Sequence, residues 1–501
     1  MLSLIWFADW WFRSGHIGNL FLYILLSIAV WYSLSRLVLT WIAHLRIRRP
    51  ETVPVEEGLS VAIFTTSSPG EPLSMFEKTL EACRNIRYPH TTYLLDDTHD
   101  PAFRRVAERY GAVWLELVGL PGAKAGKVNK ALGLTKEDFI LILDPDHIPF
   151  PEFLDHTLGF FRDKRVGFVQ VSQAYYNQYR SFTAQGAAEQ TYTFYGPTQM
   201  GLHGLGSPVA IGANCTFRRK ALESIRGHGI GLAEDLITSV RLHARGWKSV
   251  YNPVIVSRGL VPEDFGSFSK QQLKWARGVF EVAFVELPRL FGRLKFWQKL
   301  SYLAIGTYYL VGVTAFLFTF LPFLFFFTGI LPATMSFSEF LIRGSVVAFF
   351  GVSIYLWVQR HMCHPVSERG LHWRGMILKY ASWPVFFLGF LLGVVNAEIP
   401  YIPTAKKAAT GSMSPFARPL VIQAVLFIAV FVFLLVKRRF FVSEGELVFT
   451  AEKVWGMMGF AFVAFLSAVG GILVALEARK MKVEEPWAIV ELNKINNTSD
   501  D

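Results

Sequence analysis

The sequence predicts an α/β domain inserted in a bundle of membrane-spanning α-helices, and three observations support this. The 501-residue chain is 52% hydrophobic with a mean hydropathy of +0.33, which is too apolar for a soluble enzyme. Its 18% of charged residues is too large a share for a chain that lies wholly within a bilayer. Uncharged runs of bilayer length flank residues 52–300, where short strand and helix patterns alternate.

The N-terminal part of the chain has the charge order of a membrane anchor. Residues 18–35 are uncharged, and after Arg36 the sequence stays apolar to Ala43. The basic sequence HLRIRR follows at 44–49, whereas the first twelve residues contain no Lys or Arg. A cleavable signal peptide begins with positive charge, so we expect an anchor with its N-terminus outside and its basic end in the cytoplasm. Residues 1–12 are expected at the membrane surface.

The C-terminal part contains the remaining predicted spans. Residues 303–331 carry no charge, and as a helix of about 43 Å they exceed the ~30 Å hydrocarbon core. They are too few for two crossings, so we expect one long or kinked span with a bend at Pro322. A further span ends near Val358, and the last two cover 419–436 and 454–476.

The stretch 380–397 leaves two topologies open. Its 18 uncharged residues are just long enough to cross, but it contains Pro384 and follows the amphipathic segment GLHWRGMILKY. If it crosses, the basic loop 402–418 lies outside and the KRR at 437–439 lies inside. If it lies flat at the interface, the reverse holds, and charge counting does not decide between the two.

Residues 52–300 combine short apolar β-rich runs with helical patterns. This alternation predicts a mostly parallel sheet with helices on both faces, which binds ligands at the carboxyl ends of its strands. The expected strands are 59–65, 92–95, 139–143, 166–171 and 248–251. The expected helices are 72–86, 101–109, 124–134, 151–162 and 234–244.

Acidic residues stand at the ends of two of these strands. Asp96 and Asp97 end one strand, and Asp144 and Asp146 follow another. Two carboxylates beside a strand end can hold Mg²⁺ or Mn²⁺, which prefer oxygen ligands and often share a site with substrate phosphates. Acids also cap helices, but the second acidic strand end strengthens the interpretation as a metal site.

A glycine- and lysine-rich segment, GLPGAKAGKVNKAL, lies between these strands at 119–132. Its glycines and lysines could approach and neutralise a diphosphate, although a loop followed by a basic helix face would have the same composition. Lys127 is followed by Val128 rather than Ser or Thr, so the segment is not a P-loop. It favours diphosphate binding without ATPase machinery.

Two later helices carry further polar candidates. Glu234 and Asp235 open one of them, either as acids that favour a helix N-terminus or as a general base. On the other, the spacing of Gln271, Lys274 and Trp275 puts them on one face. A Trp face can stack on a sugar ring and a Lys can meet a phosphate, and the same helix also has the pattern of an amphipathic membrane-surface helix.

Cysteine content and net charge exclude several classes of protein. Cys83, Cys215 and Cys363 are odd in number and far apart, so we expect neither a disulfide scaffold nor a structural zinc site. The net charge of +11 is explained by basic residues beside membrane segments. No sequence pattern of a nucleic-acid-binding module accompanies it, and we expect no nucleic-acid partner.

These motifs, in this order, resemble the processive family-2 glycosyltransferases, and most closely the bacterial cellulose synthase catalytic subunits and related β-glucan synthases. The resemblance runs through about 59–290 and returns after the third predicted span. It implies a GT-A (Rossmann-like) α/β glycosyltransferase domain over 52–290, on the cytosolic side of an α-helical transmembrane channel of about five spans plus interfacial helices.

The resemblance also implies roles for individual residues. LLDDTHD matches the uridine-binding acidic motif, DPDH the DxD metal motif, AED the TED motif of the catalytic base, and QQLKW the QRxRW motif. Asp144 and Asp146 are thus expected to hold Mg²⁺ or Mn²⁺, and Asp235 to act as base with Glu234 beside it. The implied donor-binding residues are Asp96, Asp97, Lys124, Asp144, Gln271, Gln272, Lys274, Thr404 and Lys406. The implied acceptor-binding residues are Asn214, Cys215 and Trp275.

Several of these motifs depart from the family pattern. Thr98 replaces the usual Gly of the first acidic motif, and Lys127 replaces the usual Asn after KAG. The FCGS core of the acceptor segment is ANCT in this chain, at 213–216. Gln272 and Lys274 stand where the family has arginines, so the bidentate guanidinium fork is lost.

The sequence YIPTAK at 401–406 resembles the FxVTxK gating loop, which covers the donor from the cytosolic side. A gating loop at 398–412 has to be inside, so the resemblance favours an interfacial helix at 373–397 and five spans in total. The expected organisation is then an anchor segment (1–51), the glycosyltransferase domain (52–290), a channel region (291–476) and a short cytosolic tail (477–501). Nothing after Leu476 resembles a PilZ domain, so control by cyclic di-GMP is not expected.

The implied function is an inverting, processive synthase in the bacterial inner (plasma) membrane. It would move sugar from a UDP-sugar, with UDP-glucose favoured, to a growing β-glycan and translocate the polymer across the lipid bilayer. The alternatives are a chitin, hyaluronan, poly-N-acetylglucosamine or mannan-type synthase, or a non-processive glycosyltransferase with a lipid acceptor. A transporter with a nucleotide-binding regulatory domain is an alternative of another class.

Overall fold

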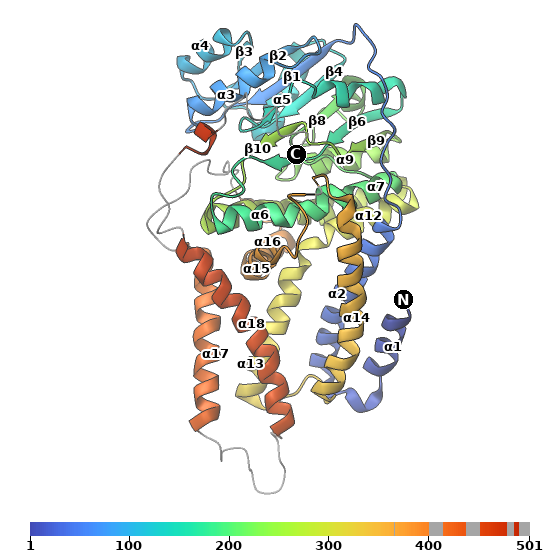
Figure 1. Ribbon diagram of the computed structural model, residues 1–501, viewed down its shortest axis with the longest axis vertical. Helices are drawn as coiled ribbons and strands as arrows, with labels where there is room; N and C mark the ends of the chain where they lie inside the picture. Colours follow the sequence, from blue (N-terminus) through green and yellow to red (C-terminus); the bar gives the residue numbers. More distant parts are fainter. Residues whose placement is uncertain (365, 400–413, 437–450, 478–484, 490–501) are drawn as a thin grey trace.

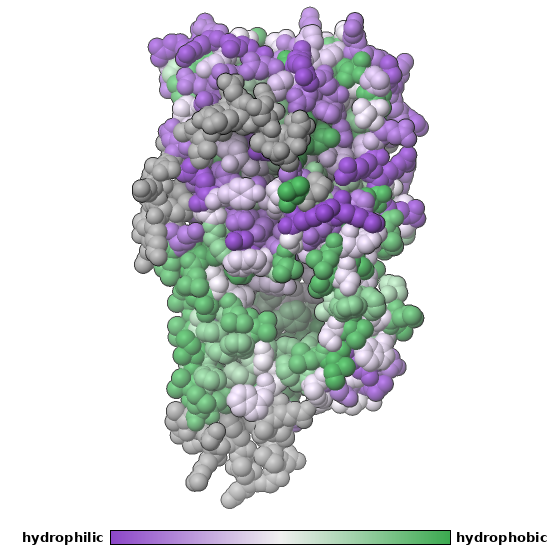
Figure 2. Space-filling view, viewed as in Figure 1, coloured by the Kyte–Doolittle hydropathy of each residue, from purple (hydrophilic) through white to green (hydrophobic). Residues whose placement is uncertain are grey.

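The structure is a computed structural model that describes residues 1–364, 366–399, 414–436, 451–477 and 485–489. An α/β domain lies at one end of a bundle of long helices (Figure 1). Hydrophilic residues cover the α/β domain, and hydrophobic residues cover most of the bundle's surface (Figure 2). The predicted fold class, an α/β domain inserted in a helical membrane region, is confirmed.

The α/β domain is built on a seven-stranded sheet with the order β3-β2-β1-β4-β8-β6-β9. Its strands are β1 (Val61–Thr66), β2 (Thr91–Asp96), β3 (Val113–Glu116), β4 (Phe139–Leu143), β6 (Val166–Val171), β8 (Cys215–Arg218) and β9 (Lys248–Asn252). All neighbours pair in parallel except β8, which runs antiparallel to β4 and β6. The five expected strands are present to within two residues at their ends, whereas β3 and β8 were not predicted.

Both faces of the sheet are buried, as a sheet covered by helices requires. Ile63 and Leu141 enter a hydrophobic cluster on one face, and their neighbours Ala62 and Ile140 enter the cluster on the other. A smaller sheet of β5 (Ile148–Pro149), β10 (Ser257–Gly259) and β7 (Ala174–Tyr175) follows the carboxyl end of β4. The strands therefore end at a polar edge, where the candidate site lies.

Four of the five predicted helices of this domain are confirmed. They are α3 (Leu73–Arg84), α4 (Pro101–Arg109), α5 (Ala123–Leu134) and α9 (Glu234–Ala244). The fifth, at 151–162, was wrong, because this segment forms only two short 3₁₀ turns, Leu154–His156 and Leu158–Arg162. A Cβ atom on Gly159 would lie 1.9 Å from the carbonyl oxygen of Val53, so the segment follows the incoming linker in close contact.

Five helices are long and apolar enough to cross a membrane, in agreement with the five predicted spans. They cover Leu20–His44 (α2), Phe296–Thr328 (α12 and α13), Phe337–His361 (α14 and a 3₁₀ turn), Pro415–Leu435 and Lys453–Glu477. The last two spans belong to α17 (Arg418–Val436), with the turn before it, and to α18 (Ala451–Glu477). The N-terminal helix α1 (Leu2–Trp11) packs lengthwise beside α14 (Phe337–Val358) (Figure 1). Its Phe7 and Trp10 rings are buried against that helix, and its expected position at the membrane surface stays a prediction.

The second span is interrupted at a place that the sequence analysis did not predict. Helix α13 (Val311–Thr328) continues through Pro322, and the interruption is the turn between Gly306, where α12 (Phe296–Gly306) ends, and Val311. The interruption leaves backbone carbonyl groups without partners inside the helix, and two side chains one turn apart on α2 donate hydrogen bonds to them. Tyr32 donates its hydroxyl to the Thr307 carbonyl at 2.7 Å, and Arg36 donates to the Ala304 carbonyl.

The expected interfacial helix at 373–397 is two helices, α15 (Trp373–Ala381) and α16 (Trp383–Val394), which are bent by 47°. Pro384 lies in the first turn of α16 and cannot supply the backbone hydrogen bond that would continue α15. Figure 1 shows both helices nearly end-on, across the direction of the long helices and beneath α6 (Phe182–Thr193). Their placement at the interface stays a prediction.

Helix α16 packs closely on α10 (Phe265–Glu281), the helix that carries the QQLKW motif. A Cβ atom on Gly389 would lie 2.7 Å from Cβ of Ala276, and one on Gly393 would lie 2.7 Å from Cβ of Phe280. Arg277 of α10 also donates to the Asn396 side chain and the Ala397 carbonyl, both at 2.9 Å. The end of α16 is thereby fixed to the helix that carries candidate site residues.

We expect Gly389→Leu to lower the melting temperature of the detergent-solubilised protein by a few degrees, because overpacking at a helix crossing costs about 1–3 kcal/mol. Gly344→Leu is the matched control, since a Cβ atom at that position meets nothing within 4 Å. Equal melting temperatures for the two variants would contradict the assigned α10–α16 contact.

Candidate active site

The carboxyl end of β4 brings three potential metal ligands together. Asp144, Asp146 and His147 each offer a ligand atom, and these atoms lie within 4.8 Å of one another. Asp146 is 4% exposed, and its Oδ2 accepts a hydrogen bond from the Leu260 amide at 3.2 Å. Two carboxylates and an imidazole suit a divalent cation such as Mn²⁺, so the donor set fits the predicted metal.

His147 was not among the predicted site residues, although the signal for it was present in the sequence. It directly follows the DPD sequence and its side chain is buried. The Nδ1 atom of His147 lies 3.6 Å from Oδ1 of Asp146, and its Nε2 atom lies 3.0 Å from the amide nitrogen of Gln173. The ring is therefore held beside the carboxylate pair.

Lys124, at the start of α5, connects this cluster to the acids of α9. Its ammonium donates to Oδ1 of Asp144 at 2.5 Å and to the Gly212 carbonyl. Burial lowers the pKa of Lys124, but the nearby carboxylates of Asp144, Glu234 and Asp235 raise it, and the net pKa lies above its usual value. The side chain thus remains a cation among acidic groups.

The acidic pair at the N-terminus of α9 lies on the same cavity as Asp144. The carboxylate of Asp235 accepts a hydrogen bond from the Leu236 amide at 2.7 Å. Burial, together with the charge of Glu234, raises the pKa of Asp235 to about 7. A carboxyl group that titrates near neutrality can accept a proton from an attacking hydroxyl group, as a general base requires.

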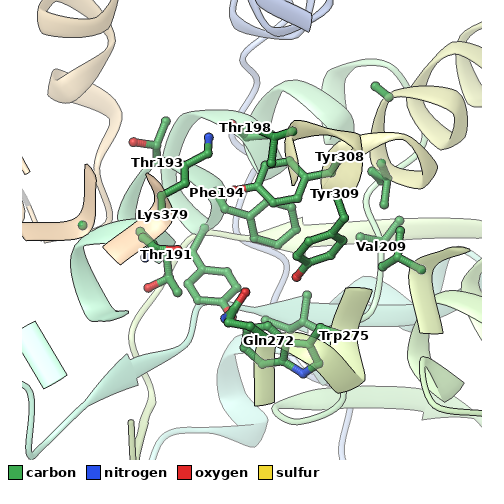
Figure 3. Close-up of a pocket in the computed structure, with 18 of the residues that line it drawn as sticks. Thr191, Thr193, Phe194, Thr198, Val209, Gln272, Trp275, Tyr308, Tyr309 and Lys379 are labelled. Carbon is green, nitrogen blue, oxygen red and sulfur yellow. The ribbon is translucent and has the colours of Figure 1, made fainter. Parts of the chain in front are cut away.

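All four of the predicted residues on α10 line this cavity: Gln271, Gln272, Lys274 and Trp275. Figure 3 shows Gln272 and Trp275 beside each other at one side of it. Trp275 packs against a hydrophobic cluster that includes Tyr309. The spacing argument that placed Gln271, Lys274 and Trp275 on one face is confirmed.

The structure does not bring the first acidic motif to the cavity. Asp96 is fully buried and accepts hydrogen bonds from Ser67 Oγ, from Thr98 Oγ1 at 2.8 Å and from the Trp114 indole at 3.0 Å. Asp97 accepts a hydrogen bond from the Gly119 amide at 3.0 Å and lies 3.4 Å from the Lys127 ammonium. Asp96 thus organises the surrounding loops, and uridine binding by this pair stays a prediction.

Asn214 and Cys215 are also away from the cavity lining among the described residues. Cys215 begins β8 and enters the hydrophobic cluster on one face of the sheet, where burial raises the pKa of its thiol well above its usual value. Asn214 is fully buried and adopts a positive φ of 56°. Their predicted contact with the acceptor stays a prediction. Thr404 and Lys406 lie outside the described residues.

The cavity extends from the acidic cluster into the helical bundle. It has a volume of about 1300 Å³, and its lining includes Asp144, Asp235, Tyr32 of α2, Phe318 of α13 and Val352 of α14. Figure 3 shows its middle part, where Tyr308 and Tyr309 face residues of the α6 region such as Thr191 and Phe194. Figure 2 shows a recess in the hydrophobic half of the surface. A single space therefore joins the candidate catalytic groups to the membrane helices.

Two cations lie close to one aromatic ring of the cavity lining. The Arg36 guanidinium lies 5.4 Å from the centroid of the Tyr308 ring, and the Lys379 ammonium lies 5.1 Å from the same ring. All three side chains line the cavity. Sequence reasoning missed this group, because its members lie on three helices that are distant along the chain.

Comparison with known proteins agrees with this geometry. Residues 139–334 match the model of the glycosyl transferase family group 2. Over these residues the chain thus matches a family-2 glycosyltransferase domain. It is 28% identical to a cellulose synthase catalytic subunit of Komagataeibacter sucrofermentans over 375 residues, which covers 72% of this chain and 47% of that protein.

A second homologue is the cellulose synthase catalytic subunit of Xanthomonas axonopodis pv. citri. It is 30% identical over 277 residues, which covers 53% of this chain and 38% of that protein. The chain thus spans less than half the length of these curated relatives. The resemblance to cellulose synthase catalytic subunits that the motifs indicated is confirmed at the level of homology.

The fold also has a counterpart among solved structures. A mannosyltransferase from Pyrobaculum calidifontis, in complex with GDP-Man and Mn²⁺, superposes with a TM-score of 0.52 at 17% identity. The superposition covers 75% of this chain and 100% of that one. At this identity the likeness establishes the fold, and the α/β domain has the predicted GT-A fold.

We expect Asp146→Asn to weaken Mn²⁺ binding at least about tenfold, because it removes the charge of one of two carboxylates in the donor set. Binding is measured by electron paramagnetic resonance titration in the presence of UDP. Asp163→Asn is the control, since this carboxylate bonds to Lys248 at the surface. Unchanged Mn²⁺ affinity in Asp146→Asn would contradict the assignment of Asp146 as a metal ligand.

Proposed function

We propose that the protein is a membrane-embedded, inverting, processive glycosyltransferase that polymerises a UDP-sugar, with UDP-glucose favoured, into a β-linked glycan. The observation that carries the proposal is the cavity that joins Asp144 and Asp235 to the membrane helices. An enzyme with a soluble acceptor has no need of a continuous space from the reacting groups into the bilayer. Homology to cellulose synthase catalytic subunits supports UDP-glucose as the donor.

The proposed reaction needs an acid–base group and charge stabilisation for the leaving nucleotide. Asp235 accepts the proton of the acceptor hydroxyl as its oxygen attacks C1 of the donor sugar, and UDP leaves from the opposite side. Lys274 lies on the same cavity and would neutralise charge on the departing diphosphate. A divalent cation held by Asp144, Asp146 and His147 supplies further neutralisation of the diphosphate when bound.

The same cavity provides a path for the product. Trp275 would stack on the acceptor sugar, and Tyr308 and Tyr309 present further rings on the way to the membrane helices. Repeated sugar transfer without release of the product requires such contacts along the growing glycan. Thr404 and Lys406 of the predicted gating loop would cover the donor, and the GT-A domain would then lie on the cytosolic side of the membrane.

A panel of donors tests the proposal. Purified protein in nanodiscs receives UDP-glucose, UDP-N-acetylglucosamine or GDP-mannose with Mg²⁺ or Mn²⁺, and nucleotide release is followed. We expect release from UDP-glucose and a polymer that a linkage-specific β-glucanase digests. Release from UDP-N-acetylglucosamine alone would exclude the glucan but retain a polymerase, whereas release without polymer would indicate a non-processive transferase.

The titration of Asp235 predicts the pH dependence of the rate. The base form is the deprotonated one, so kcat/KM should rise with pH to a plateau above about 7. Glu234→Gln removes the like charge that raises the pKa of Asp235, so this rise should move to lower pH. A shift to higher pH would contradict the assignment.

Asp235→Asn tests the role of the base directly. It should reduce kcat by about 10²–10⁴-fold, because general-base catalysis contributes a factor of that size, while UDP binding persists. Polymer synthesis at the full rate in this variant would eliminate Asp235 as the base.

A further inference from the structure

The described part of the C-terminal tail returns to the α/β domain after the last membrane helix. Figure 1 shows this short red turn (Pro486–Ile489) beside α3, away from the red helix α18. Trp487 in the turn is 1% exposed, and it belongs to a hydrophobic cluster of side chains from α3, β2 and α4. A tail that only trailed in solvent would not bury its largest side chain.

Polar contacts fix the orientation of this tryptophan. Its indole nitrogen donates to Ser74 Oγ at 2.9 Å, and Ser74 Oγ in turn donates to Glu485 Oε2 at 3.3 Å. Ser74 lies on α3, so the beginning of the turn is held to this helix. The cluster that contains Trp487 is thus a defined binding site for the tail.

The same cluster reaches the candidate site. Trp114, Tyr176 and Leu260 pack against it as partly buried members. Trp114 donates its indole N–H to Asp96, and the Leu260 amide donates to Asp146. Leu260 also lines the cavity. Residues packed against the cluster therefore bond to one candidate metal ligand, through the Leu260 backbone, and to the first acidic motif, through the Trp114 side chain.

The other end of the tail is attached to the channel region. Glu477, at the end of α18 (Ala451–Glu477), accepts a hydrogen bond from the Phe182 amide at the start of α6. Val463 of α18 lines the cavity. Trp487 follows Glu477 by only ten residues, so the chain connects a cavity-lining membrane helix to the donor side of the GT-A domain.

We propose that Trp487 is a positioning residue, which holds the donor-binding edge of the GT-A domain in place through the cluster that Leu260 and Trp114 pack against. This inference rests on the proposed function in that it takes Asp146 to face a nucleotide-sugar. The described turn thereby acts as an internal brace for the edge of the domain that would bind the donor.

The test uses the full-length protein with Trp487→Ala, Trp487→Phe and Ser74→Ala. We expect Trp487→Ala to raise KM for the nucleotide-sugar roughly tenfold with kcat nearly unchanged, since the brace affects binding rather than the chemical step. Trp487→Phe should recover most of the affinity because it refills the cluster, and Ser74→Ala should have a smaller effect. Trp455→Ala is the matched control, since that tryptophan of α18 is 64% exposed.

Hydrogen exchange provides a readout that does not require catalysis. The peptide containing Leu260 should exchange faster in Trp487→Ala than in the parent protein, because its amide is held against Asp146. If no donor supports turnover, the proposed function fails while this measurement still tests the brace. Unchanged KM together with unchanged exchange in a folded Trp487→Ala protein would overturn the inference. If Trp487→Ala does not fold, unchanged values in both Trp487→Phe and Ser74→Ala would do so.

Discussion

The ammonium group of Lys124 lies among acidic groups that come from separate parts of the chain: Asp144 after β4, and Glu234 and Asp235 at the start of α9. Without a cation these carboxylates would repel one another in a buried space, and removing the cation would leave uncompensated buried charge at a cost of about 3–5 kcal/mol. Lys124 also binds the Gly212 carbonyl, so one side chain fixes the strand end, a loop and a helix together. We therefore expect the distance between the candidate metal-binding acids and the candidate base to depend on this contact.

The elements that the sequence predicted well are those with strong local patterns. Strands such as 139–143 are short apolar runs that end in acids, and they fold as expected. Strand β8 escaped prediction because its polar sequence, CTFR, becomes a strand only by pairing with β4 and β6. The segment 151–162 has helical periodicity, but contact with Val53 decides its path. Pro322 lies inside α13 without ending it, and the interruption occurs instead at Thr307–Leu310, where α2 supplies hydrogen bonds.

The candidate site shows the same division between local and distant information. The face of α10 followed from helical spacing, and the acids after β4 followed from their place at a strand end. Asp96 has the expected sequence position, but its oxygens are used by Ser67, Thr98 and Trp114, which no local pattern reveals. The Leu260 amide carries no sequence signal at all, because any residue except proline offers a backbone N–H.

The two cations close to the Tyr308 ring, Arg36 and Lys379, have a consequence for the electrical insulation of the membrane. A cavity that extends among the membrane helices could conduct protons and metal ions. Each elementary charge that crosses the membrane dissipates about 2.3 kcal/mol per 100 mV of membrane potential. Fixed positive charges in a pore raise the energy of a passing cation, whereas neutral hydroxyl-bearing cargo is not repelled. The two cations would therefore oppose cation leakage along the same route that a sugar polymer could follow.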